Sequence, residues 1–153
     1  MSQVSARLDL KGLVHQAETC WYDLNRWPEW VDGLSEIVET HGDWPRTGST
    51  VVWRSGPAGR GTVRERVIEY EPRSGQTSEI EDDSITAVQR VSFTPREENT
   101  EVELSLDYKL KRRSPFSALV DLLFIRRLMG GSLARTLGQF RAAVEASHRA
   151  SVK

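Results

Sequence analysis

Glu65 is the residue of this sequence best suited to acid or base chemistry. It stands midway between Val63 and Val67, and side chains at alternate positions of a strand point to the same face. If the two valines face a core, the carboxyl group lies in that core with them. Burial among apolar groups would raise its pKa and make it a candidate general acid or base.

The neighbouring residues leave the orientation of this strand open. Ile68 and Tyr70 have the opposite parity to the two valines, and Arg64 and Arg66 flank the glutamate as in a solvent-exposed strand. Either the strand has a bulge near Arg66 or the valines belong to its outer face. In the second case Glu65 is an ordinary surface carboxylate.

Tyr108 is the second candidate for chemistry. It shares a face with Leu104 and Leu106 in a strictly alternating segment, so its ring should be buried and its hydroxyl should need a partner. The pattern favours a core tyrosine bonded to the backbone over one that contacts a ligand. With Glu65 it would form the acid/base pair of an enzyme.

Other catalytic and metal-binding patterns are missing from the sequence. The three histidines and the single Cys20 have no zinc-ligand spacing, so we predict no metal and no cofactor. The glycine-rich run 55–61 lacks the Gly-Lys-Ser/Thr ending of a phosphate loop, and it lies between two strands. We interpret it as a hairpin loop that could gate a cavity.

Composition narrows the class of protein. The chain has 153 residues, 38% of them hydrophobic and 28% charged, which fits one globular domain over 1–153 with a disordered last few residues. The net charge of −1 gives no case for nucleic-acid binding. With one cysteine, no signal peptide and no apolar run long enough to span a membrane, we expect a cytoplasmic protein.

The periodicity predicts an α+β chain that ends in one long helix. A first strand (5–10) precedes two short helices, one from Val14 to about Asn25 and one starting at Pro28. Turn signals then separate six strands, and consecutive strands joined by such turns pair antiparallel. These strands are 36–41, 49–54, 62–70, 77–81, 85–93 and 100–110.

The terminal helix is predicted over 115–148 and carries an apolar stripe that only a matching sheet face could bury. The stripe is formed by Leu119, Leu122, Ile125, Met129, Leu133, Leu137, Phe140 and Val144. Gly130 and Gly131 each weaken the helix by about 1 kcal/mol, which suggests a kink or a close approach. The apolar segment 116–129 has two interpretations, burial under the sheet or transient contact with a membrane.

The order of elements resembles that of the START/Bet v 1-like (SRPBCC) superfamily, and in particular the bacterial polyketide cyclase/dehydrase and lipid-transport proteins. The similarity covers nearly the whole chain. It depends on Asp-Leu-Asn-Arg-Trp-Pro-Glu-Trp (23–30), Gly-Ser-Thr-Val-Val-Trp (48–53), Phe-Ile-Arg-Arg (124–127) and Leu-Ala-Arg-Thr-Leu (133–137). The resemblance implies a helix-grip fold, in which a curved sheet of about seven strands wraps the long helix.

That fold implies a cavity for an apolar or amphipathic small molecule such as a lipid, polyketide, sterol or quinone. We expect its wall to include Trp30, Trp53, Val67, Phe93, Leu106, Tyr108, Met129, Leu133 and Phe140. The preferred hypothesis is a non-catalytic binding or transport protein. The alternatives are a cyclase or aromatase that uses Glu65 and Tyr108, and a protein-interaction module with a filled core and no cavity.

Overall fold

A seven-stranded antiparallel sheet forms the body of the protein, in the order β1-β7-β6-β5-β4-β3-β2. The computed structural model describes residues 2–57, 59–111 and 118–152, with side chains given outside 118–124 and 148–152. The strands are β1 (Ser2–Lys11), β2 (Leu34–His41), β3 (Thr50–Ser55), β4 (Thr62–Glu71), β5 (Gly75–Glu81), β6 (Ile85–Arg96) and β7 (Asn99–Leu110).

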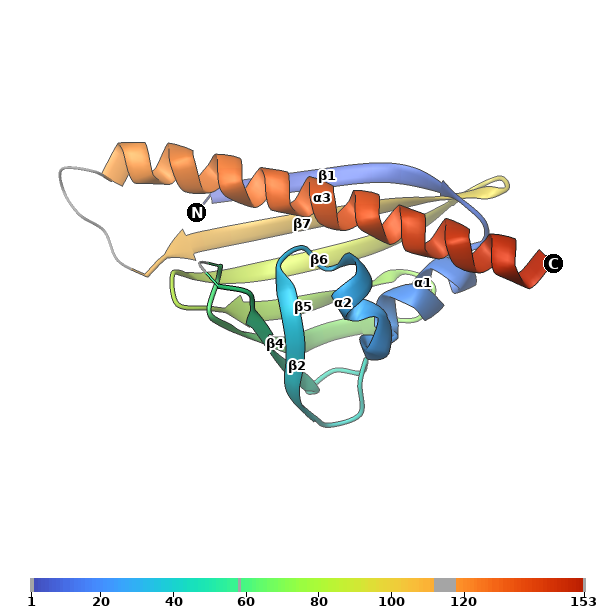
Figure 1. The fold of residues 1–153 in the computed structure, drawn as a ribbon, viewed down its shortest axis with the longest axis horizontal. Helices are drawn as coiled ribbons and strands as arrows, with labels where there is room; N and C mark the ends of the chain where they lie inside the picture. The colour runs from blue at the N-terminus through green and yellow to red at the C-terminus, as the bar shows by residue number, and fades with distance from the viewer. Residues whose placement is uncertain (1, 58, 112–117, 153) are drawn as a thin grey trace.

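Helices cover one face of the sheet. The long helix α3 (Ala118–Val152) runs the length of the molecule beside β1 (Figure 1). The short helix α1 (Val14–Tyr22) lies near its C-terminal end, and α2 (Trp27–Trp30) lies nearer its middle. A 3₁₀ helix, η1 (Leu24–Arg26), joins the two short helices. Pro28 falls in the first turn of α2, where its missing N–H costs no helical hydrogen bond.

The predicted element order is confirmed, with small differences at the ends. The first helix stops at Tyr22 rather than Asn25, because Asp23 leaves the helical conformation and its carboxylate accepts a hydrogen bond from the Asn25 N–H. The terminal helix continues past His148 to Val152, and its predicted start at Pro115 lies outside the described residues.

The core lies between the concave face of the sheet and the apolar stripe of α3. Leu133, Leu137, Phe140 and Val144 are buried, whereas the side chains of Leu119 and Leu122 lie outside the described set. The helix passes through Gly130 and Gly131 without interruption, and the predicted kink is not seen there (Figure 1). A Cβ at Gly130 would meet no atom within 4 Å, so close approach does not explain this glycine.

The orientation of β4 is settled by a bulge. Val63, Glu65 and Val67 are all buried, and the pairing of β4 with β5 shifts register between Val67 and Glu69. The bulge therefore reverses the parity after Val67, slightly later than the predicted position near Arg66. Glu65 points inward.

Candidate functional site

Glu65 is enclosed on the concave face of the sheet and bonded to a tryptophan. Its side chain accepts a hydrogen bond of 2.6 Å from the indole nitrogen of Trp53 on the neighbouring strand, and the residue is only 6% exposed. Burial raises the pKa of Glu65 above its usual range, while the Trp53 hydrogen bond and the charge of Arg60 lower it by less. The site therefore favours a carboxyl group that holds its proton to a higher pH than a surface glutamate does.

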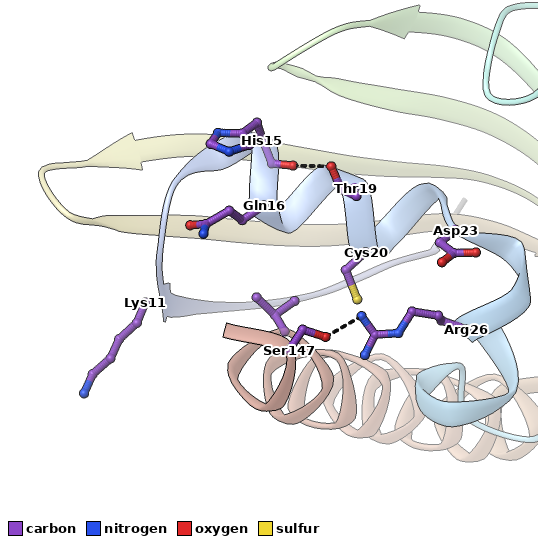
Figure 2. Close-up of a pocket in the computed structure, with 9 residues that line it drawn as sticks. Lys11, His15, Gln16, Thr19, Cys20, Asp23, Arg26 and Ser147 are labelled. Carbon is purple, nitrogen blue, oxygen red and sulfur yellow. Dashed lines mark hydrogen bonds between the residues drawn. The ribbon is translucent and has the colours of Figure 1, made fainter. Parts of the chain in front are cut away.

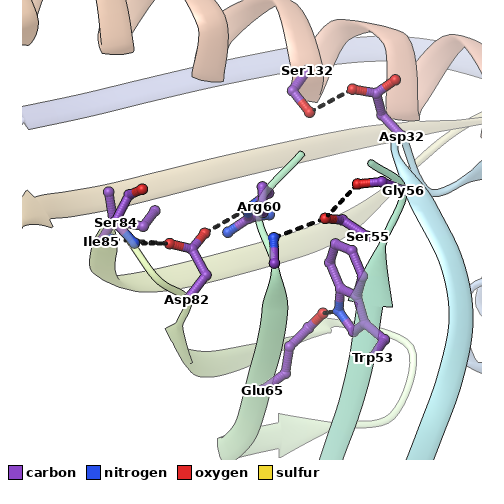
Figure 3. Close-up of polar contacts among 11 residues, drawn as sticks. Asp32, Trp53, Ser55, Gly56, Arg60, Glu65, Asp82, Ser84, Ile85 and Ser132 are labelled. Atoms are coloured by element: carbon purple, nitrogen blue, oxygen red, sulfur yellow. Dashed lines mark hydrogen bonds and ion pairs between the residues drawn. The ribbon is translucent and has the colours of Figure 1, made fainter. Parts of the chain in front are cut away.

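Arg60 reaches this part of the interior from the β3–β4 hairpin loop. Its Nε donates to Asp82 at 2.7 Å, and the Asp82 side chain is only 2% exposed. Asp82 also accepts from the backbone N–H groups of Ser84 and Ile85, so the β5–β6 turn fixes its position (Figure 3). The guanidinium carbon lies 5.6 Å from the centroid of the Trp53 ring, within cation–π range.

The opposite wall joins α3 to the segment that follows α2. Ser132 donates to the Asp32 carboxylate at 2.8 Å, and Arg135 donates to the same carboxylate at 3.2 and 3.3 Å. The Asp32 backbone N–H donates to Thr136 at 3.0 Å. These contacts hold α3, directly after its two glycines, against the segment that follows α2, and Figure 3 shows the one between Ser132 and Asp32.

A small cavity lies between these groups. Its volume is about 40 Å³, well below the ~300 Å³ typical of the smaller ligand sites. Large aromatic side chains occupy much of the space that a curved sheet alone would leave open. The cavity is lined by Trp21, Trp27, Trp30, Val31, Asp32, Trp53, Arg60, Glu65, Gln76, Gln89, Leu104, Ser132, Leu133 and Thr136.

The structure brings only part of the expected wall to this cavity. Trp30, Trp53 and Leu133 line it. Met129 is partly buried and packs against the core. The remaining apolar residues of the expected wall are buried without lining this cavity, namely Val67, Phe93, Leu106 and Phe140.

Tyr108 is buried but stands apart from Glu65. The strand register aligns Glu65 with Ile80, Ile80 with Ala87, and Ala87 with Tyr108, so three strand spacings separate the two candidates. Tyr108 is not among the residues that line the 40 Å³ cavity. Its hydroxyl has no hydrogen-bond partner within the described part of the chain, so the expected bond to the backbone is not seen there.

Apart from Glu65, sequence reasoning missed the polar residues of the site. Gln89 lies between Ala87 and Val91 in strict alternation, so the period of two could have placed it on the inner face. Arg60 belongs to a glycine-rich loop that has no periodicity. Its position depends on Asp82, which is distant in the sequence, and no local pattern signals that pairing.

A second pocket, of about 280 Å³, opens at the surface beside α1 and the C-terminal part of α3 (Figure 2). Arg26 crosses it and donates to Glu29, to the Ser147 hydroxyl and to the Ala143 carbonyl at 2.9, 2.7 and 3.1 Å. Because this arginine is already bonded within the protein, we interpret the pocket as a polar junction between helices. Its lining residues are Lys11, His15, Gln16, Thr19, Cys20, Asp23, Arg26, Val144 and Ser147.

The described residues offer neither a metal site nor a membrane-spanning helix. No group of three or more His, Cys, Asp or Glu side chains there is arranged to hold a metal ion. None of the helices in that part of the chain combines the length and apolar character needed to cross a bilayer. The segment 116–129, for which membrane contact was an alternative, lies largely outside the residues whose side chains are described.

The sheet order and the long final helix define a helix-grip fold of the START/Bet v 1-like class. The chain belongs to the polyketide cyclase/dehydrase and lipid transport family, whose model matches residues 1–145. Family and fold together support a role in binding hydrophobic ligands. A search of curated protein sequences gave no match.

Solved structures share this fold at low sequence identity. The Thermus thermophilus protein TTHA0849 has a TM-score of 0.77 at 20% identity, covering 95% of this chain and 99% of its own. A START superfamily protein from Mycobacterium smegmatis has a TM-score of 0.75 at 15% identity, covering 94% of this chain and 97% of its own. Norcoclaurine synthase from Thalictrum flavum, solved with dopamine and hydroxybenzaldehyde, has a TM-score of 0.71 at 15% identity, covering 95% of this chain and 87% of its own.

Proposed function

We propose that this protein binds or carries an apolar or amphipathic small molecule, such as a lipid, polyketide, sterol or quinone, between the concave face of the sheet and α3. The supporting observation is an interior cavity in which indole rings meet a few polar groups. Such a combination is typical of ligand sites, where apolar walls supply affinity and convergent polar groups set orientation.

The small volume of the cavity gives this proposal a structural requirement. A space of about 40 Å³ is close to that of a single water molecule, so a ligand needs the walls to separate. Two polar contacts restrain residues that line the cavity, the Arg60–Asp82 pair between two loops of the sheet and the Asp32–Ser132 bond between α3 and the segment after α2. We propose that one or both open when a ligand is taken up.

The test is a titration of the protein with N-phenyl-1-naphthylamine, a neutral apolar dye that fluoresces when it leaves water. We expect saturable binding near one dye per protein. Leu133→Phe, which adds bulk at the cavity wall, should weaken binding, whereas Leu128→Phe on the same helix should not, because Leu128 is 45% exposed. Equal effects of the two variants, or no saturable binding, would count against this cavity as the site.

One specific observation supports the alternative function as a cyclase or aromatase. Glu65 is a buried carboxyl group with a raised pKa at the wall of the same cavity, as a general acid or base requires. The separation of Tyr108 from the cavity argues against the two-residue version. We therefore propose Glu65 alone as the candidate catalytic group, to be tested by loss of cyclisation of a poly-β-keto substrate in Glu65→Gln.

A further inference from the structure

Three tryptophan indoles of this protein donate to acceptors within the chain, and a fourth differs from them. Trp27 and Trp44 donate to the backbone carbonyls of Trp21 and Tyr22 at 2.8 and 2.9 Å, and Trp53 donates to Glu65. The Trp30 indole nitrogen is buried and has no acceptor within the described ranges, although the residue is only 1% exposed. An unpaired buried donor of this kind costs free energy unless something binds it.

Trp30 cannot easily turn to find another partner. Its ring centroid lies 4.6 Å from that of Trp21 and 5.0 Å from that of Phe140, and Trp27 packs at 6.1 Å. These contacts fix the indole plane from several sides. The N–H direction is therefore set by the core before any ligand arrives.

Arg60 supplies a second donor at the same cavity. Its Nε is engaged by Asp82, but its Nη2 is buried and has no acceptor among the residues the structure describes. The ion pair with Asp82 and the Trp53 ring hold the guanidinium in place. Both Trp30 and Arg60 line the 40 Å³ cavity, and each has a buried donor without an acceptor in the described part of the chain.

We propose that Trp30 and Arg60 form a polar subsite that binds a carbonyl-type oxygen of an otherwise apolar, uncharged ligand. Two N–H donors match the two lone pairs of such an oxygen. The inference rests on the proposed function, because it concerns the ligand of the same cavity. It adds the identity of the anchoring group and the residues that recognise it.

The charges around the cavity favour a neutral acceptor over an anion. The positive charge of Arg60 is already balanced by Asp82 at 2.7 Å. The Asp32 carboxylate lines the same cavity, so an anionic ligand would bring a second negative charge close to it in a site of low dielectric constant. A ketone or similar carbonyl group uses both donors without that penalty.

The test compares three naphthalenes of similar size by isothermal titration calorimetry. They are 2-acetylnaphthalene, in which a carbonyl is present, 2-isopropenylnaphthalene, in which a CH₂ group replaces the oxygen, and the anion 2-naphthoate. We expect the ketone to bind about tenfold more tightly than the alkene, because the alkene leaves both donors unpaired. The naphthoate should bind less tightly than the ketone.

Two variants locate the effect. Trp30→Phe and Arg60→Met should each lower the ratio of ketone affinity to alkene affinity toward one, because each removes one of the two donors and a comparison within one variant cancels any change in the apolar wall. Arg64→Met on the exposed face of β4 is the matched control and should change neither the ketone affinity nor the alkene affinity. In Arg60→Met, Asp82 keeps its two backbone donors, and near-ultraviolet circular dichroism checks the fold.

The outcomes separate the two proposals. Equal binding of ketone and alkene would overturn the subsite, with the donors serving water only, and would leave the binding function in place. Tighter binding of naphthoate would overturn the choice of a neutral acceptor. Failure of all three compounds to bind would count against the proposed function itself.

Discussion

Trp53 on β3 donates its indole hydrogen to Glu65 on β4, and this bond joins two residues that are diagonal neighbours in the sheet. In the register, Trp53 pairs with Val63 and Glu65 pairs with Val51. The 2.6 Å contact explains how a carboxyl group is accommodated on a buried face of the sheet. It also keeps the group at the wall of the cavity, where a ligand would meet it.

The first prediction concerns the pH dependence of stability in Glu65→Gln. Because the pKa of Glu65 is raised in the folded state, the folded protein binds the proton more strongly than the unfolded chain does. Stability from this group is present below the unfolded pKa of about 4.3 and is lost as the pH rises through the folded pKa. As the pH rises through that window, the free energy of unfolding of the glutamine variant should therefore increase relative to that of the wild type by up to about 1.4 kcal/mol per pH unit.

Urea unfolding of both proteins at several pH values measures this difference. Glu69→Gln, on the exposed face of the same strand, serves as the control and should show a smaller change with pH. A difference between wild type and Glu65→Gln that stays constant with pH would show that Glu65 is not buried as described.

The second prediction concerns the Trp53–Glu65 bond itself. Trp53→Phe should lower the free energy of unfolding by about 1–3 kcal/mol, because it leaves a buried carboxyl group without its donor. The same change made in a Glu65→Leu background should cost less, since no buried acceptor is then stranded. Chemical unfolding of the four proteins gives a coupling energy, and a coupling near zero would contradict the bond.

The third prediction concerns the contacts of Asp32 with α3. Ser132→Ala should cost about 1 kcal/mol of stability, because it removes a partly buried hydrogen bond to the Asp32 carboxylate. Arg135→Ala removes an ion pair to the same carboxylate, but the arginine side chain is 57% exposed and its loss should cost less. Urea unfolding measures both, and a larger loss for Arg135→Ala would reverse our ranking of these contacts.

The fourth prediction concerns Gly130. Gly130→Ala should raise the free energy of unfolding by up to about 1 kcal/mol, because alanine favours the helix and a Cβ there meets no neighbour. Ala134→Gly, at an exposed position of the same helix, should lower it by a similar amount. If the first variant were instead destabilised, Gly130 would have a packing role that the structure does not show.

Stopped-flow mixing with the dye tests whether α3 bends at Gly130 and Gly131 when a ligand enters. If the helix must bend at the two glycines to admit a ligand, Gly130→Ala should slow dye uptake while the protein becomes more stable. Unchanged uptake would mean that the walls separate elsewhere, at the Arg60 loop or the Asp32 contacts.

The fifth prediction concerns the thiol of Cys20. The side chain is buried, and burial raises the pKa of Cys20 to about 11, so little thiolate forms near neutral pH. Ellman's reagent at pH 8 should modify the native protein much more slowly than the protein in denaturant. Equal rates in both states would place Cys20 at the surface.

The fold could be predicted from the sequence because its signals are local and repeated. Period-two alternation from Val102 to Leu110 and the stripe of α3 each depend on spacing within one element, and turn residues mark where the strands end. The family-specific segments then pointed to one architecture. The bulge after Val67 was only partly foreseen, since a change of parity signals a bulge without giving its position.

The candidate site was predicted only in part, because it depends on side chains brought together from distant segments. Alternation placed Glu65 with Val63 and Val67, but nothing local indicates that Trp53 donates to it. The pairing of Arg60 with Asp82 joins a loop to a turn 22 residues away. The cavity volume could not be foreseen either, because it depends on how far each indole ring fills the concave face.

The most direct test of ligand binding is to extract the purified native protein with organic solvent and analyse the extract by mass spectrometry. We predict an apolar or amphipathic small molecule near one per protein, and a lower amount in Leu133→Phe than in Leu128→Phe. An extract without any such molecule, from a protein that also fails to bind the neutral dye up to its solubility limit, would contradict the account.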